Sequence, residues 1–180
     1  MKLLMLISDG MEECEALVTR DVLSRAGIEV FMASTNQKDF VISQNGLQVK
    51  ADGPKIGSLD QFAGIILPGG GLGTKNLDQY KDIDSLLAYF VNSDKLVCAI
   101  CAAPSVVGKR GYLRGCDFTC FSGFEKVIDG NHKTLPVVTS DNFITAKSMY
   151  YASDFGLAII EKLLGKDKRN AIEKSIKSEL

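Results

Sequence analysis

The residue with the clearest chemical potential is Cys101, which follows an apolar run and precedes two alanines and a proline. Leu96–Ile100 is typical of a buried strand, and Ala102–Pro104 favours the start of a helix. A strand–elbow–helix turn of this kind exposes a side chain beside free backbone N–H groups. The helix dipole favours a thiolate there, so the sequence predicts a reactive thiol with a lowered pKa. The alternative is a cysteine that is simply buried.

Strands and helices alternate along the chain and must position Cys101. Apolar runs favour strands at Lys2–Ile7, Glu29–Ser34, Gly64–Pro68, Leu96–Ile100, Asp117–Phe121, Val137–Ser140 and Phe143–Lys147. Helical patterns favour helices at Glu12–Ala26, Asp82–Val91, Ala102–Gly108, Ser153–Leu164 and Arg169–Leu180, with a hairpin or edge pair over Phe40–Asp52. This order predicts an α/β protein with a mostly parallel sheet that is covered on both faces.

Ligands of such sheets bind at the carboxyl ends of the strands. Three segments should meet there: the loop after Ile7, the run Gly69–Gly73 and the elbow at Cys101. The glycine run lacks the spacing of a phosphate-binding loop, so we do not expect a nucleotide site. Its other interpretation is a flexible turn.

Bulk properties narrow the class of protein. The chain has 180 residues, which suits one domain over residues 1–180. Its net charge of −1 argues against nucleic-acid binding, and its apolar runs are too short to span a membrane. The five cysteines are an odd number and no export signal precedes them, which predicts a reduced, cytoplasmic protein.

Several motifs, taken in order and at their spacing, resemble the ThiJ/PfpI superfamily and specifically its parkinsonism-associated DJ-1 branch. They are DGMEECEA (9–16), RAGIEV (25–30), LPGG (67–70) followed by LG (72–73), AICAAP (99–104) and LAIIE (157–161), and they extend over nearly the whole chain. The resemblance implies a flavodoxin-like three-layer α/β sandwich that forms a homodimer. It also implies activity without a metal or an organic cofactor.

The resemblance assigns roles to four residues. Cys101 matches the family's nucleophile, and Glu15 matches the acid of the first helix that approaches the sulfur. The backbone N–H groups of Gly70 and Ala102 match an oxyanion-binding pair. Burial and a neighbouring thiolate would both raise the pKa of Glu15, so that it could donate a hydrogen bond to sulfur and move a proton. Alternatively, Glu15 is a first-turn glutamate favoured by the helix dipole, although neighbouring acids already serve that role.

The chain also departs from the family pattern. Phe121 stands where many members carry a histidine, so a Cys-His-acid triad is not expected and peptidase activity is in doubt. Asn45 replaces a frequent arginine, and Lys147–Tyr151 replaces an Arg-Gly-Pro stretch, which should alter one pocket wall. His132, the one histidine, lies in a polar segment and is expected to face solvent.

Cys98 and Cys101 form a C-x-x-C pattern that could indicate a dithiol site. Cys98 lies inside the predicted strand, and side chains alternate along a strand. The odd offset therefore predicts thiols on opposite faces, with Cys98 buried. Cys14 is expected near the dimer contact, and Cys116 and Cys120 are expected in a strand.

Two functions remain open. The first, by resemblance, is a cofactor-independent enzyme of the glyoxalase or protein-deglycase type, in which Cys101 attacks a small aldehyde or ketoaldehyde. The second is a non-enzymatic redox sensor or chaperone-like protein of oxidative stress, in which Cys101 is oxidised rather than turned over. Glutamine amidotransfer would need a downstream His-x-Glu, which the sequence lacks.

Overall fold

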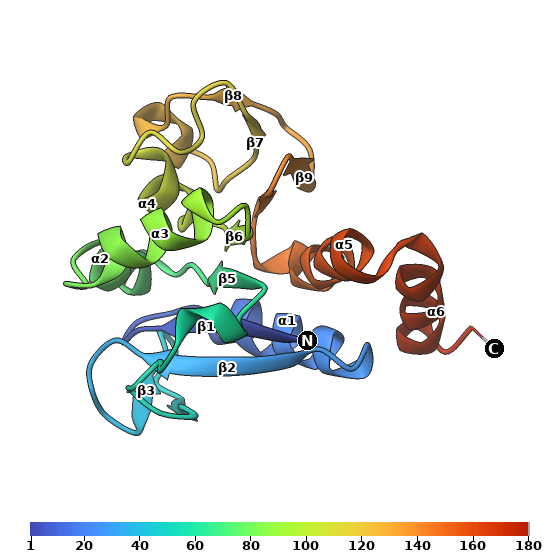
Figure 1. The fold of residues 1–180 in the computed structure, drawn as a ribbon, viewed down its shortest axis with the longest axis horizontal. Helices are drawn as coiled ribbons and strands as arrows, with labels where there is room; N and C mark the ends of the chain where they lie inside the picture. The colour runs from blue at the N-terminus through green and yellow to red at the C-terminus, as the bar shows by residue number, and fades with distance from the viewer. Residues whose placement is uncertain (180) are drawn as a thin grey trace.

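One six-stranded sheet forms the centre of the fold (Figure 1). The computed structural model describes residues 1–179, and Leu180, the end of the predicted final helix, lies outside the described residues. The strand order is β2 (Glu29–Ser34), β1 (Lys2–Ile7), β5 (Gly64–Leu67), β6 (Leu96–Ile100), β10 (Phe143–Ala146) and β9 (Val137–Ser140). Neighbouring strands are parallel except β10 and β9, which are antiparallel. The predicted mostly parallel sheet is confirmed.

Helices cover both faces of the sheet, because alternate strand residues feed two separate hydrophobic cores. Met5 of β1 packs in one core, with residues of α1 (Glu13–Arg25) and α5 (Ala152–Leu164). Leu4, its neighbour, packs in the other core. That second core takes residues from three helices, which are α2 (Gly71–Asp78), α3 (Ile83–Asn92) and α4 (Pro104–Gly108). The three-layer sandwich is therefore confirmed.

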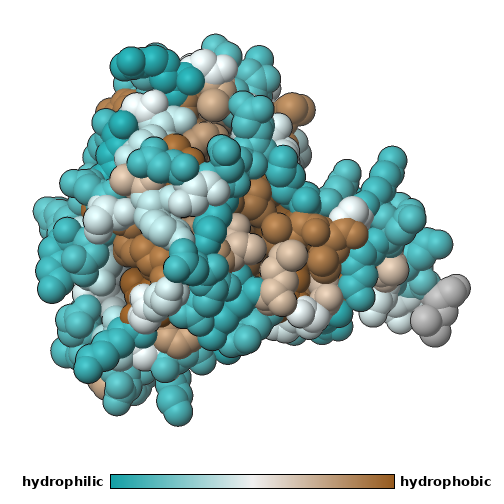
Figure 2. All heavy atoms as spheres, viewed as in Figure 1, coloured by the Kyte–Doolittle hydropathy of each residue, from teal (hydrophilic) through white to brown (hydrophobic). Residues whose placement is uncertain are grey.

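The C-terminal helix α6 (Lys166–Lys177) packs on α5 at the edge of the molecule (Figure 1). Of its residues only Ile172 is buried, and Figure 2 shows mainly hydrophilic residues over it. No helix within residues 1–179 combines the length and the apolar character that crossing a membrane needs.

Two small sheets lie outside the main one. The predicted hairpin is confirmed as β3 (Phe40–Ile42) paired with β4 (Gln48–Lys50). The strand predicted over Asp117–Phe121 is wrong in extent, because β7 covers only Asp117–Phe118 and pairs with β8 (Asn131–His132). The described residues also form short 3-10 helices, which are η1 (Leu59–Gln61), η2 (Phe124–Val127) and η3 (Met149–Tyr151).

The sequence does not predict helix α2, because glycine is a poor helix former and the run Gly69–Gly73 is also typical of a flexible turn. Gly70 caps this helix with a φ of +88°, which favours glycine. A Cβ on Gly73 would lie 2.5 Å from Met11 Cα, so the missing side chain lets α2 approach the loop after β1. The glycines thus serve close packing at the carboxyl edge of the sheet.

Candidate active site

Cys101 occupies the elbow between β6 and α4, as the sequence predicted. Its φ of +65° is uncommon for a residue with a side chain, and two backbone hydrogen bonds hold it there. The Cys101 N–H donates to Ala146 O at 2.8 Å, and the Cys101 carbonyl accepts from Phe121 N–H at 2.7 Å. Strand β10 and the segment after β7 therefore fix the direction of the thiol.

Glu15, in the first turn of α1, reaches the same point from the other side. Its side chain is buried, and its Oε2 accepts a hydrogen bond from Gly69 N–H at 2.7 Å. Its Oε1 is also buried, has no conventional hydrogen-bond partner, and is left to interact with the Cys101 thiol. The buried carboxyl group therefore lies beside the partly exposed Cys101.

Gly69 makes this approach possible, a role that the sequence did not reveal. A Cβ at this position would lie 2.7 Å from Glu15 Oε2 and 2.8 Å from Cys101 Cβ. Both distances are too short for real contacts, so a side chain here would separate the acid from the thiol. The signal was present only as one glycine among several in Gly69–Gly73.

The protonation of the pair is governed by burial. Burial raises the pKa of Glu15 to about 7, although contacts with Cys101 and the Gly69 N–H partly oppose the rise. Burial and the Glu15 carboxylate raise the pKa of Cys101 to about 12, while the N–H groups of Gly70 and Ala102 lower it. The predicted lowered pKa of Cys101 is therefore wrong, because these two N–H groups do not outweigh desolvation and a neighbouring negative charge.

These two pKa values belong to the pair, because each group shifts the pKa of the other. One proton leaves near pH 7 and the second near pH 12, so the pair holds a single proton across the range between. When that proton is on Glu15, the sulfur is a thiolate that faces the N–H groups of Gly70 and Ala102. The two values place the single proton mainly on Cys101, and the minor form with the proton on Glu15 supplies a nucleophile and an acid at once.

A cavity of about 480 Å³ opens over the thiol. It is lined by Glu12, Glu15, Gln44, Gly70, Gly71, Cys101, Ala102, Phe121, Phe124, Ser148, Met149 and Tyr150. All four predicted site residues line it, and Ser148–Tyr150 form a wall, as expected for the altered segment Lys147–Tyr151. Another cavity of about 490 Å³ near Asp9 has no thiol in its lining.

The departures from the family pattern have structural consequences. Phe121, in the position of the family histidine, lines the cavity, whereas His132 does not. The Asn45 amide donates to Glu13 Oε1 at 2.7 Å, and the neighbouring Gln44 lines the cavity instead. The residues that line the cavity include no histidine, so no imidazole there can take a proton from Cys101.

The other cysteines differ partly from expectation. Cys98 is buried, as predicted, but its thiol and Cys101 pack against the same core, so the expected opposite faces are wrong. Strand alternation ends at Ile100, and the positive φ of Cys101 turns its side chain back. Cys14 is exposed, while Cys116 and Cys120 flank β7 rather than lie within it.

Comparison with known proteins agrees with this architecture. The family model described as "DJ-1/PfpI family" matches residues 1–162. Protein dj-1beta of Drosophila melanogaster is 32% identical over 178 residues, which cover 96% of this chain and 95% of the relative. The glutathione-independent glyoxalase DJR-1.2 of Caenorhabditis elegans is 34% identical, with 97% of this chain and 94% of the relative covered.

Solved structures give the same result. Oxidized DJ-1 of Toxoplasma gondii superposes with a TM-score of 0.91 at 28% identity, covering 97% of both chains. Drosophila melanogaster DJ-1beta superposes with a TM-score of 0.88 at 31% identity, covering 97% of this chain and 96% of that one. The fold, the motifs and these matches together show that the chain belongs to the DJ-1/PfpI family.

Proposed function

We propose that this protein is a glyoxalase-type enzyme that uses Cys101 and Glu15 to convert small ketoaldehydes without added glutathione. The observation that carries the proposal is the buried acid–thiol pair, which holds one proton and opens onto a cavity. Relatives named glutathione-independent glyoxalase, from Caenorhabditis elegans and Schizosaccharomyces pombe, support glyoxalase-like activity. A protein-deglycase reaction would use the same thiol on a carbonyl adduct.

The first step is addition of sulfur to the aldehyde. The Cys101 thiolate forms a C–S bond with the aldehyde carbon, and the carbonyl electrons move onto its oxygen. That oxygen takes the proton of Glu15, which leaves a hemithioacetal and a Glu15 carboxylate. The N–H groups of Gly70 and Ala102, which lower the pKa of the Cys101 thiol, would stabilise the developing negative charge on oxygen.

Glu15 then moves protons within the bound substrate. Its carboxylate removes the proton from the former aldehyde carbon and transfers it to the ketone oxygen, which gives an enediol. Return of a hydroxyl proton to the adjacent carbon yields a thioester of a hydroxy acid. Water hydrolyses the thioester and restores the thiol, so ketoaldehyde plus water gives a hydroxy acid without an oxidant or reductant.

Alkylation of Cys101 tests the assignment. Wild-type protein should consume methylglyoxal without added thiol, and iodoacetamide should abolish turnover in step with the labelling of Cys101 in peptide maps. Methylglyoxal present during labelling should slow the loss of activity and the alkylation of Cys101 to the same extent. Full activity in protein whose Cys101 is completely alkylated would refute the proposal.

The second candidate function, redox sensing, is favoured by the same accessible thiol and by the oxidized state named for the Toxoplasma gondii relative. We predict that peroxide converts Cys101 to the sulfinic acid and that oxidation slows there, because Glu15 and the two N–H groups can bind the new oxygens. Intact mass spectrometry should show further oxidation in Glu15→Ala at the same peroxide dose. Identical oxidised species in both proteins would show that Glu15 does not stabilise the oxidised sulfur.

A further inference from the structure

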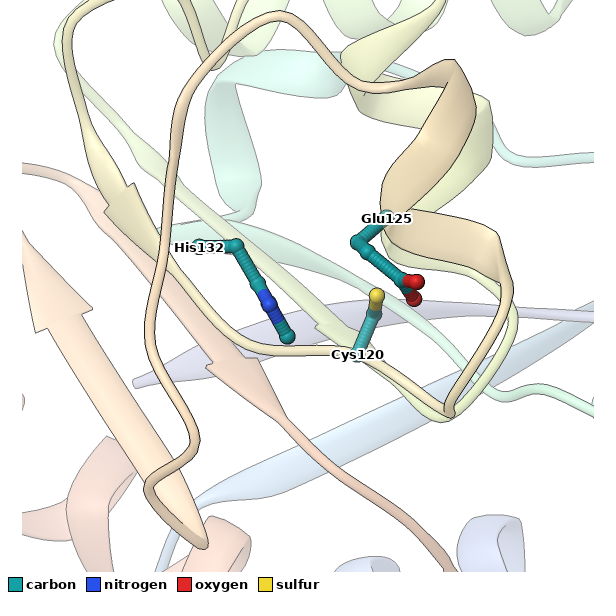
Figure 3. Close-up of side chains that lie close together, drawn as sticks. All are labelled: Cys120, Glu125 and His132. Carbon is teal, nitrogen blue, oxygen red and sulfur yellow. The ribbon is translucent and has the colours of Figure 1, made fainter.

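Three metal-binding side chains converge beside the cavity but outside the proposed dyad. They are Cys120, Glu125 and His132, whose sulfur, carboxylate oxygen and ring nitrogen all lie within 4.8 Å of one another. Figure 3 shows the His132 ring and the Glu125 carboxylate approaching the Cys120 sulfur from opposite sides. We propose that these three side chains form a binding site for a divalent zinc-like cation.

The donor set indicates the class of ion. One sulfur, one imidazole nitrogen and one carboxylate oxygen match the ligands that Zn²⁺ accepts, whereas Mg²⁺ and Ca²⁺ prefer oxygen alone. Three protein ligands leave a fourth tetrahedral position for water. Bonds from zinc to its ligands are about 2.0–2.3 Å long, so donor atoms within 4.8 Å of one another can close around one ion through side-chain movement.

The fold fixes the backbone positions of the three ligands, and only the side chains of Glu125 and His132 need to move. Cys120 is buried and directly precedes Phe121, whose N–H is bonded to Cys101 O at 2.7 Å. His132 pairs with Phe118 across the β7–β8 ladder, and their rings pack with centroids 5.4 Å apart. Glu125 is half-buried and His132 is exposed, so both side chains can shift towards an ion.

The Glu125 carboxylate has one oxygen that is available to bind an ion. Glu125 Oε2 accepts a hydrogen bond from Gly123 N–H at 2.6 Å, which orients the group. A carboxylate can keep this bond with one oxygen and bind an ion with the other. The backbone N–H groups of Glu125 itself and of Gly123 lower the pKa of Glu125, so the carboxylate is charged at neutral pH.

Binding must displace one proton. A thiol binds a metal ion as the thiolate, and Cys120 has no cationic partner in the cluster that would hold it in that form. When the sulfur–metal bond forms, the thiol proton leaves to solvent and the cation compensates the new negative charge.

The ion would also link this cluster to the cavity. Phe121 and Phe124, which line the cavity, lie in the same short segment as Cys120 and Glu125. A bound ion would join that segment to His132 of β8. It would thus limit the mobility of one cavity wall without touching the acid–thiol pair.

Cobalt binding tests the proposal, with Co²⁺ as a spectroscopic substitute for Zn²⁺. Reduced wild-type protein should bind one equivalent and show a thiolate-to-cobalt charge-transfer band that Zn²⁺ abolishes. Cys120→Ser should lose the band, and His132→Ala and Glu125→Gln should each weaken binding by at least about tenfold. Cys101→Ser, Cys116→Ser and Asp129→Asn are the matched controls and should bind as wild type.

Three results would overturn the site. They are the absence of the band in wild-type protein, a band that persists in Cys120→Ser, and a band lost in Cys101→Ser instead. Cys120 is buried, and replacing it could prevent folding, so His132→Ala at an exposed position is the second decisive variant. Wild-type affinity in folded His132→Ala would equally refute the proposal.

Discussion

Replacing Cys101 by serine should lower methylglyoxal turnover by at least about 10³-fold, because Cys101 supplies the one thiol among the residues that line the cavity. A serine hydroxyl is far less acidic than a thiol, so Glu15 cannot hold its proton in the same way. The elbow itself should persist, since its two backbone hydrogen bonds do not involve the side chain. Steady-state rates, with circular dichroism to check folding, measure the effect.

Cys116→Ser is the matched control for this experiment. Cys116 is partly exposed, flanks β7 and does not line the cavity, so its replacement should leave turnover near the wild-type rate. Turnover that survives in Cys101→Ser but falls in Cys116→Ser would move the chemistry away from the elbow.

Glu15→Gln should change how stability depends on pH, because Glu15 binds its proton more tightly in the folded chain. Its pKa rises from 4.5 to about 7 on folding, so the wild-type protein loses stability as pH increases through that window. The full loss from this group is about 3 kcal/mol above pH 7. Glutamine has no charge to bury and removes this dependence.

Urea unfolding at pH 5 and pH 8 measures the effect. The stability of Glu15→Gln relative to wild type should improve by about 2.5 kcal/mol between the two pH values. Taking the difference between the proteins cancels the other titrating groups. An unchanged difference would show that Glu15 titrates normally and is not desolvated beside Cys101.

The sequence was sufficient for the elements with strong patterns. Leu96–Ile100 is apolar throughout because β6 is buried on both faces, and its bounds match the prediction. Cys101 and Glu15 were found through the elbow and the family motifs, and the structure brings both to one cavity. Their catalytic roles, the homodimer, the single domain and the cytoplasmic location stay predictions.

What the sequence concealed depends on tertiary contacts. The role of Gly69 exists only because β5, α1 and the elbow converge on one point. The direction of the Cys101 pKa depends on how deeply the thiol is buried beside a carboxylate. Likewise His132 was expected only to face solvent, and the β7–β8 pairing places it near Cys120 and Glu125.

The central claim is that Cys101 and Glu15 share one proton, and the alkylation rate of Cys101 as a function of pH tests it most directly. In wild-type protein the rate should increase with a midpoint near pH 7, where the pair loses its first proton. In Glu15→Gln the midpoint should move to higher pH, because a buried thiol without a carboxylate to take its proton must lose it to water. An identical midpoint in both proteins would contradict the account.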